Sequence, residues 1–321
     1  MTGFTPIRTD RRRVVITGMG ALTPLGLTVH ETWQGFLAGR SGIDRITTVD
    51  LSESTSQIGG ELKGFDPRAS LGRKEARQMA RVSQMAVVAA EMAMDDAALS
   101  LSDDQKEDAG VVMGTAVGGT AVEIEKGTAS MARRGFMRIS PFYVIALPPN
   151  MPAFHVARTA GFRGHNSTTV TACAAGAQAI GDAAEVIRSG RADVMLAGGS
   201  EGALCAITFA GFAVMAALST RNDDPAASSR PFDAERDGFL LSEGAAVFVL
   251  EALEHAKRRS ARIYAELVGY AANSDGYHPI APNPDPTGPI KAMRYALADA
   301  GVEPEDVDHI NSHGTSTPLG D

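Results

Sequence analysis

The 321-residue sequence is poor in cysteine and in aromatic residues, and it lacks an excess of basic charge. Its two cysteines, Cys173 and Cys205, are too few for a disulfide scaffold or a structural zinc site. Its seven histidines show no HExxH or similar ligand spacing. These shortages exclude a disulfide-rich secreted domain, and we expect a reduced, cytoplasmic protein without a catalytic metal.

The charge balance is acidic, with a formal net charge of −8. A nucleic-acid-binding protein would need a basic face, so we expect no nucleic-acid partner. Hydrophobic residues make up 44% of the chain and charged residues 21%, which is an ordinary composition for a globular protein with a sizeable core.

Two segments imitate membrane sequences. Residues 202–220 are nineteen positions without a charge, close to the length that spans a bilayer. They are rich in alanine and glycine instead of leucine, and we expect a core segment. The basic residues 11–13 and the apolar stretch 14–22 resemble a signal peptide, but Gly18, Gly20 and Pro24 interrupt the apolar stretch. We expect no membrane association.

Short β-branched runs alternate with alanine-rich stretches, a pattern typical of βαβ units around a mostly parallel, buried sheet. The expected strands are residues 13–18, 109–114, 167–172, 192–198, 245–250, 263–272 and 308–312. The expected helices are residues 29–37, 74–99, 174–189, 253–259 and 289–300. Residues 114–164 have several prolines and glycines and no clear period, which indicates an elaborated insertion between strands.

An internal repeat indicates two related halves. In the first copy, a strand ending in Gly18 precedes the helical sequence AMDDAAL (93–99) and the strand sequence AGVVMGT (109–115). In the second copy, Gly269 precedes ALADAGV (296–302) and DHINSHGT (308–315). We therefore divide the chain into residues 1–252 and 253–321. Only seven residues follow Gly314, so we expect an incomplete second half and a longer parent chain.

The sharpest local feature is the sequence TTVTACAAGA (168–177), in which a β-branched run ends at Cys173 and a helix of small residues begins. We expect the sulfur at a strand-to-helix turn, over the positive end of the helix dipole, where a thiolate is stabilised. Backbone N–H groups at such a turn can bind a developing oxyanion. A lone cysteine is more often a small buried residue, and Cys205, inside the uncharged segment, fits that description.

His313 follows the last expected strand and precedes a turn rich in glycine and threonine. The C-terminal ends of strands are where α/β sheets place functional groups. The pseudo-symmetric position of this strand predicts that His313 faces the same crevice as Cys173.

Several motifs in a fixed order resemble the β-ketoacyl-acyl-carrier-protein synthases, and most closely the type II elongating enzymes. They are VTACAAG (170–176), LSTRN (218–222), RPFD (230–233), RDGF (236–239) and HGTSTPLGD (313–321). The resemblance covers nearly the whole chain from Arg12 to Asp321. It implies the α/β thiolase-like fold, in which two pseudo-symmetric halves form five layers, α/β/α/β/α, here with the second half incomplete.

The resemblance implies a decarboxylative condensation that lengthens fatty acyl chains. Cys173 would accept the acyl group, and His313 would donate a hydrogen bond to the malonyl thioester. Thr315 and Thr317 match threonines that bind the pantetheine arm of the substrates. The implied partner is an acyl carrier protein, and the resemblance implies no bound cofactor, because the acyl and malonyl substrates themselves carry phosphopantetheine.

Further residues match the family's pocket and its carrier-protein dock. Val117 matches the gate of the acyl pocket, and Tyr143 and Phe239 match pocket-lining aromatics, with Tyr143 reaching the second subunit of a homodimer. Lys74 and Arg77 match basic residues that receive the acidic carrier protein, although a solvated helix face explains them nearly as well.

This sequence departs from the family at some of these sites. Gln78 stands where a third basic residue is usual, and Ser242 and Ala246 replace glycines. The family's second catalytic histidine and its lysine would follow Asp321, so the chain alone should lack full activity.

Other classes stay open. GGSEG (198–202) matches the GxSxG motif of serine hydrolases, with Ser200 as the nucleophile. Gly18 and Gly20 resemble the start of a dinucleotide-binding loop, but Thr23 takes the place of its third glycine. A polyketide-type ketosynthase and a non-catalytic chain-length partner are alternatives within the family, and the intact Cys173 argues against the latter. Acyl chain length stays undetermined.

Overall fold

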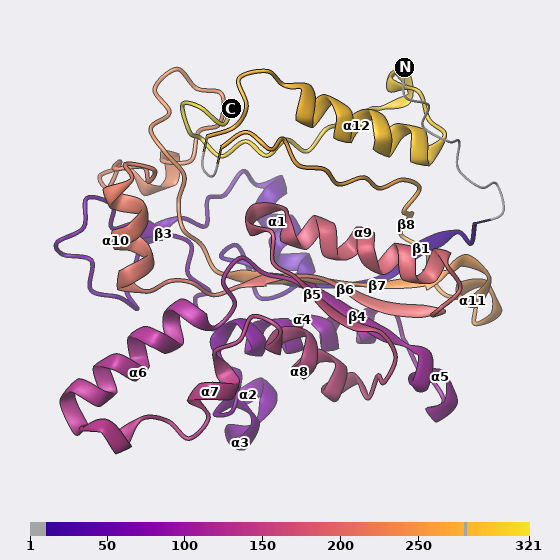
Figure 1. Cartoon of the computed structure of the whole chain (residues 1–321), viewed down its shortest axis with the longest axis horizontal. Coiled ribbons are helices and arrows are strands. Elements are labelled where there is room, and N and C mark those ends of the chain that lie inside the picture. The colour runs from indigo at the N-terminus through magenta and orange to yellow at the C-terminus, as the bar shows by residue number, and fades with distance from the viewer. Residues whose placement is uncertain (1–10, 279–280) are drawn as a thin grey trace.

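The computed structural model describes residues 11–278 and 281–321. Its centre is a six-stranded sheet in the order β5-β4-β6-β7-β1-β8 (Figure 1). In chain order the strands are β1 (Val14–Leu22), β4 (Gly110–Gly114), β5 (Asn166–Thr169), β6 (Val194–Glu201), β7 (Gly244–Ala252) and β8 (Ala265–Glu266). A separate small sheet pairs β2 (Asp44–Arg45) with β3 (Ile58–Gly59).

The sheet is mixed. β4 runs parallel to β5 and β6, whereas β7 runs antiparallel to β6 and β1, and β8 runs antiparallel to β1. By direction, β5, β4, β6 and β1 run one way and β7 and β8 run the other, so the mostly parallel sheet that the sequence predicts is interrupted by β7 and ends in the short β8. The connection from β6 to β7 brings the chain back to the end of the sheet that it left, so that Gly244 pairs with Glu201.

Helices cover both faces of the sheet. α4 (Arg81–Asp96) and α8 (Met151–Ala160) pack on one face, and α9 (Ala175–Arg188) packs on the other. Because both faces are covered, β4 is buried along its whole length, as its apolar sequence GVVMG requires. α12 (Thr287–Ala300) lies beyond α9 on the same side of the sheet (Figure 1) and is tied to α9 by an ion pair between Asp299 and Arg188.

The other helices lie in the connections between strands. They are α1 (Val29–Leu37), α2 (Pro67–Leu71), α3 (Arg73–Ala76), α5 (Asp103–Asp108), α6 (Thr120–Arg134), α7 (Tyr143–Ala146), α10 (Ala206–Val214) and α11 (Leu253–Arg258). Short 3-10 turns span Phe136–Arg138, Ala172–Ala174, Pro225–Ala227 and Pro304–Asp306. The insertion expected between strands at 114–164 joins β4 to β5 and contains α6, α7 and α8.

Two predictions for the first half need correction. The single helix predicted over 74–99 is wrong, because Ala80 adopts an extended conformation (ψ 158°) that separates α3 from α4. Residues 202–220 are only partly a core segment, since Phe209 is fully buried while Val214 is 89% exposed. Of the residues that the structure describes, no helix combines the length and apolar character needed to cross a bilayer.

The second half forms less sheet than the sequence predicts. Of the strand predicted at 263–272, only Ala265–Glu266 is regular, beside β1. The strand predicted at 308–312 is absent, and all five of these residues are exposed. A strand is stable only when a neighbour satisfies its backbone groups, and within the described residues nothing pairs with this segment.

Candidate active site

Cys173 occupies a strained turn between β5 and α9. It is exposed and lies in the 3-10 turn Ala172–Ala174, directly before the first residue of α9. Ala172 has a φ of +50°, a left-handed conformation that costs energy for any residue other than glycine. This bend places the cysteine at the N-terminus of α9, as the sequence predicts. Cys205, in contrast, is 3% exposed, with its Sγ 3.1 Å from Thr208 Oγ1.

Close approach of the strand ends to α9 depends on glycine. A Cβ placed on Gly114, at the end of β4, would lie 2.2 Å from the carbonyl oxygen of Ala175 in the first turn of α9. That turn has no side-chain cap, so its backbone N–H groups stay available to an anion or a developing oxyanion. The site therefore has a thiol and a set of backbone donors at one point.

A cavity of about 540 Å³ surrounds this turn. Its walls come from the ends of β1, β4 and β6 and from the start of β7 and α9. The lining residues are Leu22, Thr23, Pro24, Gly114, Thr115, Ala116, Ala172, Cys173, Ala175, Gly176, Gly199, Ser200, Glu201, Ser242, Glu243, Gly244, Ala245 and Ala246. Most of these side chains are small, so the space beside Cys173 is open to a substrate.

Two carboxylates in this cavity were not singled out from the sequence. Glu243 accepts from Arg81 Nε at 2.5 Å and Nη2 at 2.7 Å, and from the Leu62 N–H at 2.9 Å. Glu201, the last residue of β6, accepts from the loop after β4. The signal that could have found Glu201 is its place just beyond a buried strand, at the same edge as Cys173.

His313 lies in a segment without regular secondary structure and is exposed. Its imidazole makes no hydrogen bond within the described residues, and it is not among those that line the Cys173 cavity. The expected meeting of His313 and Cys173 in one crevice stays a prediction.

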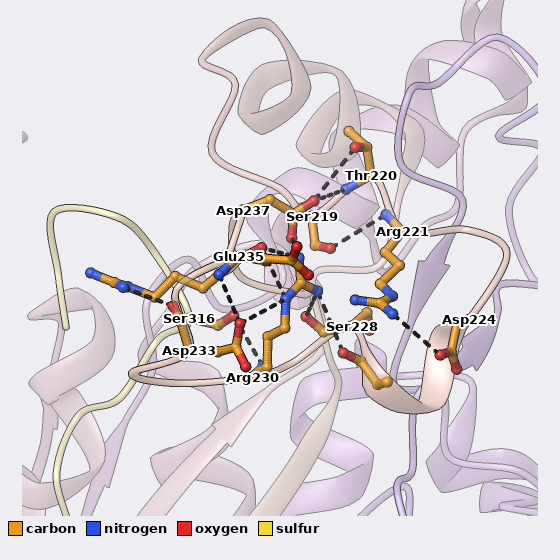
Figure 2. Close-up of polar contacts among 12 residues, drawn as sticks. Ser219, Thr220, Arg221, Asp224, Ser228, Arg230, Asp233, Glu235, Asp237 and Ser316 are labelled. Atoms are coloured by element: carbon orange, nitrogen blue, oxygen red, sulfur yellow. Dashed lines mark hydrogen bonds and ion pairs between the residues drawn. The ribbon is translucent and has the colours of Figure 1, made fainter.

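The residues after His313 are fixed against the loop 230–238. Ser316 is fully buried, with a φ of +64°. Its hydroxyl accepts from the Arg230 N–H at 3.1 Å, and its carbonyl accepts from the Gly238 N–H at 2.9 Å. Figure 2 shows Ser316 reaching into this loop from the C-terminal segment of the chain. The hydroxyls of Thr315 and Thr317 lie 2.9 Å apart.

Asp237 organises the other side of the same loop (Figure 2). Its carboxylate accepts from the Thr220 N–H at 2.9 Å and from Arg230 at 3.1 Å. Burial favours the neutral acid, but these donors and the Ser219 hydroxyl outweigh burial and hold the pKa of Asp237 below its ordinary value. The motifs LSTRN, RPFD and RDGF therefore form one polar network that supports the segment 314–321.

The other predicted pocket residues lie outside the lining of the Cys173 cavity. Val117 is 38% exposed, and its N–H donates to Glu201. Tyr143 begins α7 and packs against Gly127 of α6. The Phe239 ring meets Phe212 edge-on at 5.1 Å between centroids.

The predicted carrier-dock residues are both exposed. Lys74 lies on α3, and Arg77 follows that helix directly. With Arg73, Gln78 and Phe142 they line a separate depression of about 310 Å³. Among the described residues, no cluster of His, Cys, Asp and Glu could hold a metal ion.

The structure argues against the serine hydrolase and the dinucleotide-binding hypotheses. Ser200 lies within β6, is 4% exposed, and donates its hydroxyl to the Val82 carbonyl at 2.8 Å, so it is not presented as a nucleophile on a strand-to-helix turn. Gly18 lies inside β1 and faces α4, where a Cβ would meet the Ala93 carbonyl oxygen at 2.3 Å. It therefore serves helix packing and not a phosphate-binding turn.

Comparison with known proteins identifies the family. Residues 11–256 match the N-terminal domain of beta-ketoacyl synthases, and residues 264–321 match the C-terminal domain. The chain is 46% identical over 312 residues to 3-oxoacyl-[acyl-carrier-protein] synthase 2 of Synechocystis and 45% identical to its counterpart in Staphylococcus aureus. It covers 75% of the length of each, and these alignments cover 97% of this chain.

Solved structures agree with the sequence matches. A beta-ketoacyl synthase from Burkholderia phymatum superposes with a TM-score of 0.87 at 38% identity, over 97% of this chain and 76% of that one. The ishigamide ketosynthase/chain length factor superposes with a TM-score of 0.89 at 37% identity, over 97% and 75% of the two chains. The fold is thiolase-like, as the motifs indicated, and the chain belongs to the beta-ketoacyl synthase family.

Proposed function

We propose that this chain is a β-ketoacyl-[acyl-carrier-protein] synthase that extends fatty acyl chains by decarboxylative condensation with malonyl-acyl carrier protein. The observation that carries the proposal is the exposed Cys173 at the N-terminus of α9, inside a cavity of about 540 Å³. The relatives named 3-oxoacyl-[acyl-carrier-protein] synthase 2 support the same reaction class.

In the first step Cys173 takes the acyl group. Its thiolate attacks the carbonyl carbon of the acyl thioester, a new C–S bond forms, and the bond to the pantetheine sulfur breaks. The pantetheine thiolate takes up the proton that Cys173 lost. Transfer of an acyl group from one thiol to another is nearly balanced in energy, so the protein has only to stabilise the thiolate and the transient oxyanion. The uncapped N-terminus of α9 supplies dipole and N–H donors for both.

In the second step malonyl-acyl carrier protein loses carbon dioxide, and the resulting carbanion attacks the Cys173 thioester. The C–S bond breaks, and the Cys173 thiolate leaves. His313 donates a hydrogen bond to the malonyl thioester carbonyl, which stabilises the enolate as it forms. Thr315 and Thr317 hold the pantetheine arm. The anchoring of Ser316 by Arg230 and Gly238 supports a fixed position for this segment.

The partners follow from the same reaction. Both substrates arrive on phosphopantetheine, and no other cofactor takes part. Lys74 and Arg77 receive the acidic carrier protein, and one structural relative is a type II PKS ketosynthase in complex with its acyl-carrier protein, with a TM-score of 0.87 at 36% identity. Val117 gates the acyl pocket, and Tyr143 and Phe239 shape it.

The protein acts in the cytoplasm as a homodimer, with the halves divided at residue 252. Residues 135–146, which follow α6, expose apolar side chains that a second copy would cover. Phe136 is 78% exposed, Met137 85% and Val144 75%. Tyr143 is the first residue of α7 in this segment, and it would approach the partner subunit there.

Acyl loading tests the proposal. The protein is incubated with acyl-acyl carrier protein, and the mass of the intact protein reports covalent transfer. Wild type and Cys205→Ala should gain one acyl group, whereas Cys173→Ala should gain none. Equal loading of Cys173→Ala would remove Cys173 from its role and with it the proposed reaction.

Product analysis separates the alternatives within the family. Conversion of a saturated acyl substrate to its β-ketoacyl product favours fatty-acid elongation. Repeated condensation without reduction favours a polyketide-type ketosynthase, for which the structural relative from a type II PKS gives precedent. No acyl transfer alone, with restored activity of an added ketosynthase, would instead show a chain-length partner.

A further inference from the structure

Glu201 closes β6 at the edge of the Cys173 cavity, and the roles proposed above do not use it. One of its carboxylate oxygens, Oε2, accepts three hydrogen bonds. They come from the Thr115 hydroxyl at 3.1 Å, the Ala116 N–H at 2.7 Å and the Val117 N–H at 3.1 Å. The other oxygen accepts from the Gly202 N–H at 3.0 Å. Successive backbone donors thus converge on a single anion.

These donors belong to a wall of the cavity. Thr115 and Ala116 line the space beside Cys173. Thr115 is 3% exposed, and its hydroxyl also accepts from the Gly118 N–H at 3.0 Å. Glu201 therefore holds Thr115 directly and Gly118 through it. The Thr115 N–H also donates to the Thr169 carbonyl at 3.1 Å, so the strand end is held by its neighbour β5, whereas the N–H groups of Ala116 and Val117 are held by Glu201.

The second carboxylate in the cavity provides a contrast. Glu243 is neutralised by Arg81, which contacts both of its oxygens. Glu201 has no lysine, arginine or histidine partner within the described residues, and every hydrogen bond it accepts is from the loop after β4 or from its own neighbour. Its charge is therefore compensated by oriented N–H and O–H groups, so its geometry and the geometry of the loop are linked.

We propose that Glu201 is a positioning residue that sets acyl-chain selectivity, because it fixes the loop 115–118 that walls the space beside the nucleophile. This inference rests on the proposed acyl loading of Cys173. The relevant ligand is the hydrocarbon portion of an acyl thioester. Loss of the anchor lets the loop move and relaxes discrimination between short and long chains.

Three substitutions separate geometry from charge. Glu201→Ala removes every acceptor. Glu201→Asp keeps the charge but is shorter by one methylene group, so it cannot reach all three donors. Glu201→Gln loses the charge and the acceptor for the Gly202 N–H, but it keeps a carbonyl oxygen at the position of Oε2. If position is what matters, the Gln variant stays close to wild type and the Asp variant resembles the Ala variant.

The test is a competition for loading. Wild type and each variant receive an equimolar mixture of acyl carrier proteins that bear short, medium and long saturated chains, and intact-protein mass spectrometry gives the ratio of adducts on Cys173. In Glu201→Ala and Glu201→Asp the ratio of preferred to disfavoured chains should fall by about tenfold. Glu201→Gln should keep a ratio close to wild type.

Glu61 gives a matched control. It is 5% exposed and also anchors a loop, accepting from the N–H groups and hydroxyls of Thr47 and Thr48, but it does not line the Cys173 cavity. Glu61→Gln should leave the adduct ratio unchanged. Thermal unfolding of every variant separates selectivity from instability, and if Glu201→Ala does not fold, the comparison of Asp with Gln decides.

Two results overturn the inference. One is an unchanged adduct ratio in Glu201→Asp and Glu201→Ala. The other is a ratio that shifts in Gln but not in Asp, because charge would then matter and loop position would not. Failure of wild type to load at Cys173 is a different result, since it refutes the proposed function itself.

Discussion

In both halves of the chain a glycine packs against the backbone of a helix, but the segments that follow the two helices differ in structure. In the first half a Cβ on Gly18 would lie 2.3 Å from the Ala93 carbonyl oxygen, and in the second half a Cβ on Gly269 would lie 2.3 Å from that of Ala296. Each glycine thus lets an extended segment lie directly against a helix, α4 or α12. The repeat seen in the sequence is therefore a repeat of packing.

The segments beyond these two helices differ. Residues 110–114 form β4, which is fully buried between β5 and β6. The matching residues 308–312 form no strand and are exposed. The two segments differ in sequence, because GVVMG is apolar whereas DHINS has a single apolar residue, Ile310. Their surroundings differ as well: β4 has a neighbour on each side, and in the described part of the chain the second segment has none.

The matched glycines offer the largest effect with which to test this comparison. Gly18→Ala forces a methyl group into the backbone of a helix whose other face is also buried, and we expect a loss of about 3 kcal/mol in unfolding free energy. Gly269→Ala meets the equivalent carbonyl, that of Ala296, but α12 has no buried residue and can shift, so a loss of about 1 kcal/mol is expected. Urea unfolding of both variants measures the difference. Equal losses would mean that the second half is as tightly packed as the first.

A buried histidine on α8 can be compared with two exposed histidines near the end of the chain. His155 on α8 is 3% exposed, and within the described residues neither ring nitrogen has a hydrogen-bond partner. Burial, helped by the nearby Arg158, lowers the pKa of His155 from 6.5 to about 4. His309 and His313 in the second half are exposed.

A pH series tests that difference. As the pH falls below 6.5, the unfolded chain binds a proton that His155 in the folded protein does not bind until about pH 4. Stability therefore falls over this interval, by about 2 kcal/mol at about pH 5 relative to neutral pH. His155→Leu should remove this part of the pH dependence, whereas His309→Leu should leave it in place. The measurement is urea unfolding at both pH values, and an unchanged slope in His155→Leu would contradict the assignment.

The first half could be predicted largely from the sequence because its signals are local. The strand-to-helix turn at Cys173 follows from a β-branched run that meets small helix-forming residues, and the structure places the turn where the sequence predicts it. The direction of β7 could not be predicted, because a long connection can return a chain to either end of a sheet. Glu201 was missed because its partners are backbone N–H groups, which every residue but proline possesses.

The site residues of the second half were recognised by motif, but their placement does not follow from it. Nothing in HGTSTPLGD shows that Ser316 is the buried anchor or that its partners are Arg230 and Gly238. Those contacts join segments more than seventy residues apart in sequence. Long-range pairing of this kind becomes visible only in the folded chain.

The smallest expected effect concerns the link between the halves. The Tyr270 hydroxyl donates to Asp182 of α9 at 3.1 Å, and the same carboxylate is 3.4 Å from the hydroxyl of Thr169, at the end of β5. Burial and the adjacent Asp182 raise the pKa of Tyr270, so its hydroxyl stays protonated and donates at neutral pH. Tyr270→Phe removes this bond and keeps the ring, and we expect a loss of about 1 kcal/mol in urea unfolding.

Tyr264→Phe is the matched control for that link. The Tyr264 hydroxyl donates to Asp96 at 2.9 Å, but in an exposed setting where water can replace it, so the expected loss is below about 0.5 kcal/mol. The double variant Tyr270→Phe with Asp182→Ala should lose little more than the Asp182 change alone, since each change removes the same bond. Additive losses would show that Tyr270 and Asp182 act separately and that the second half is held to α9 by Arg188 and Asp299 instead.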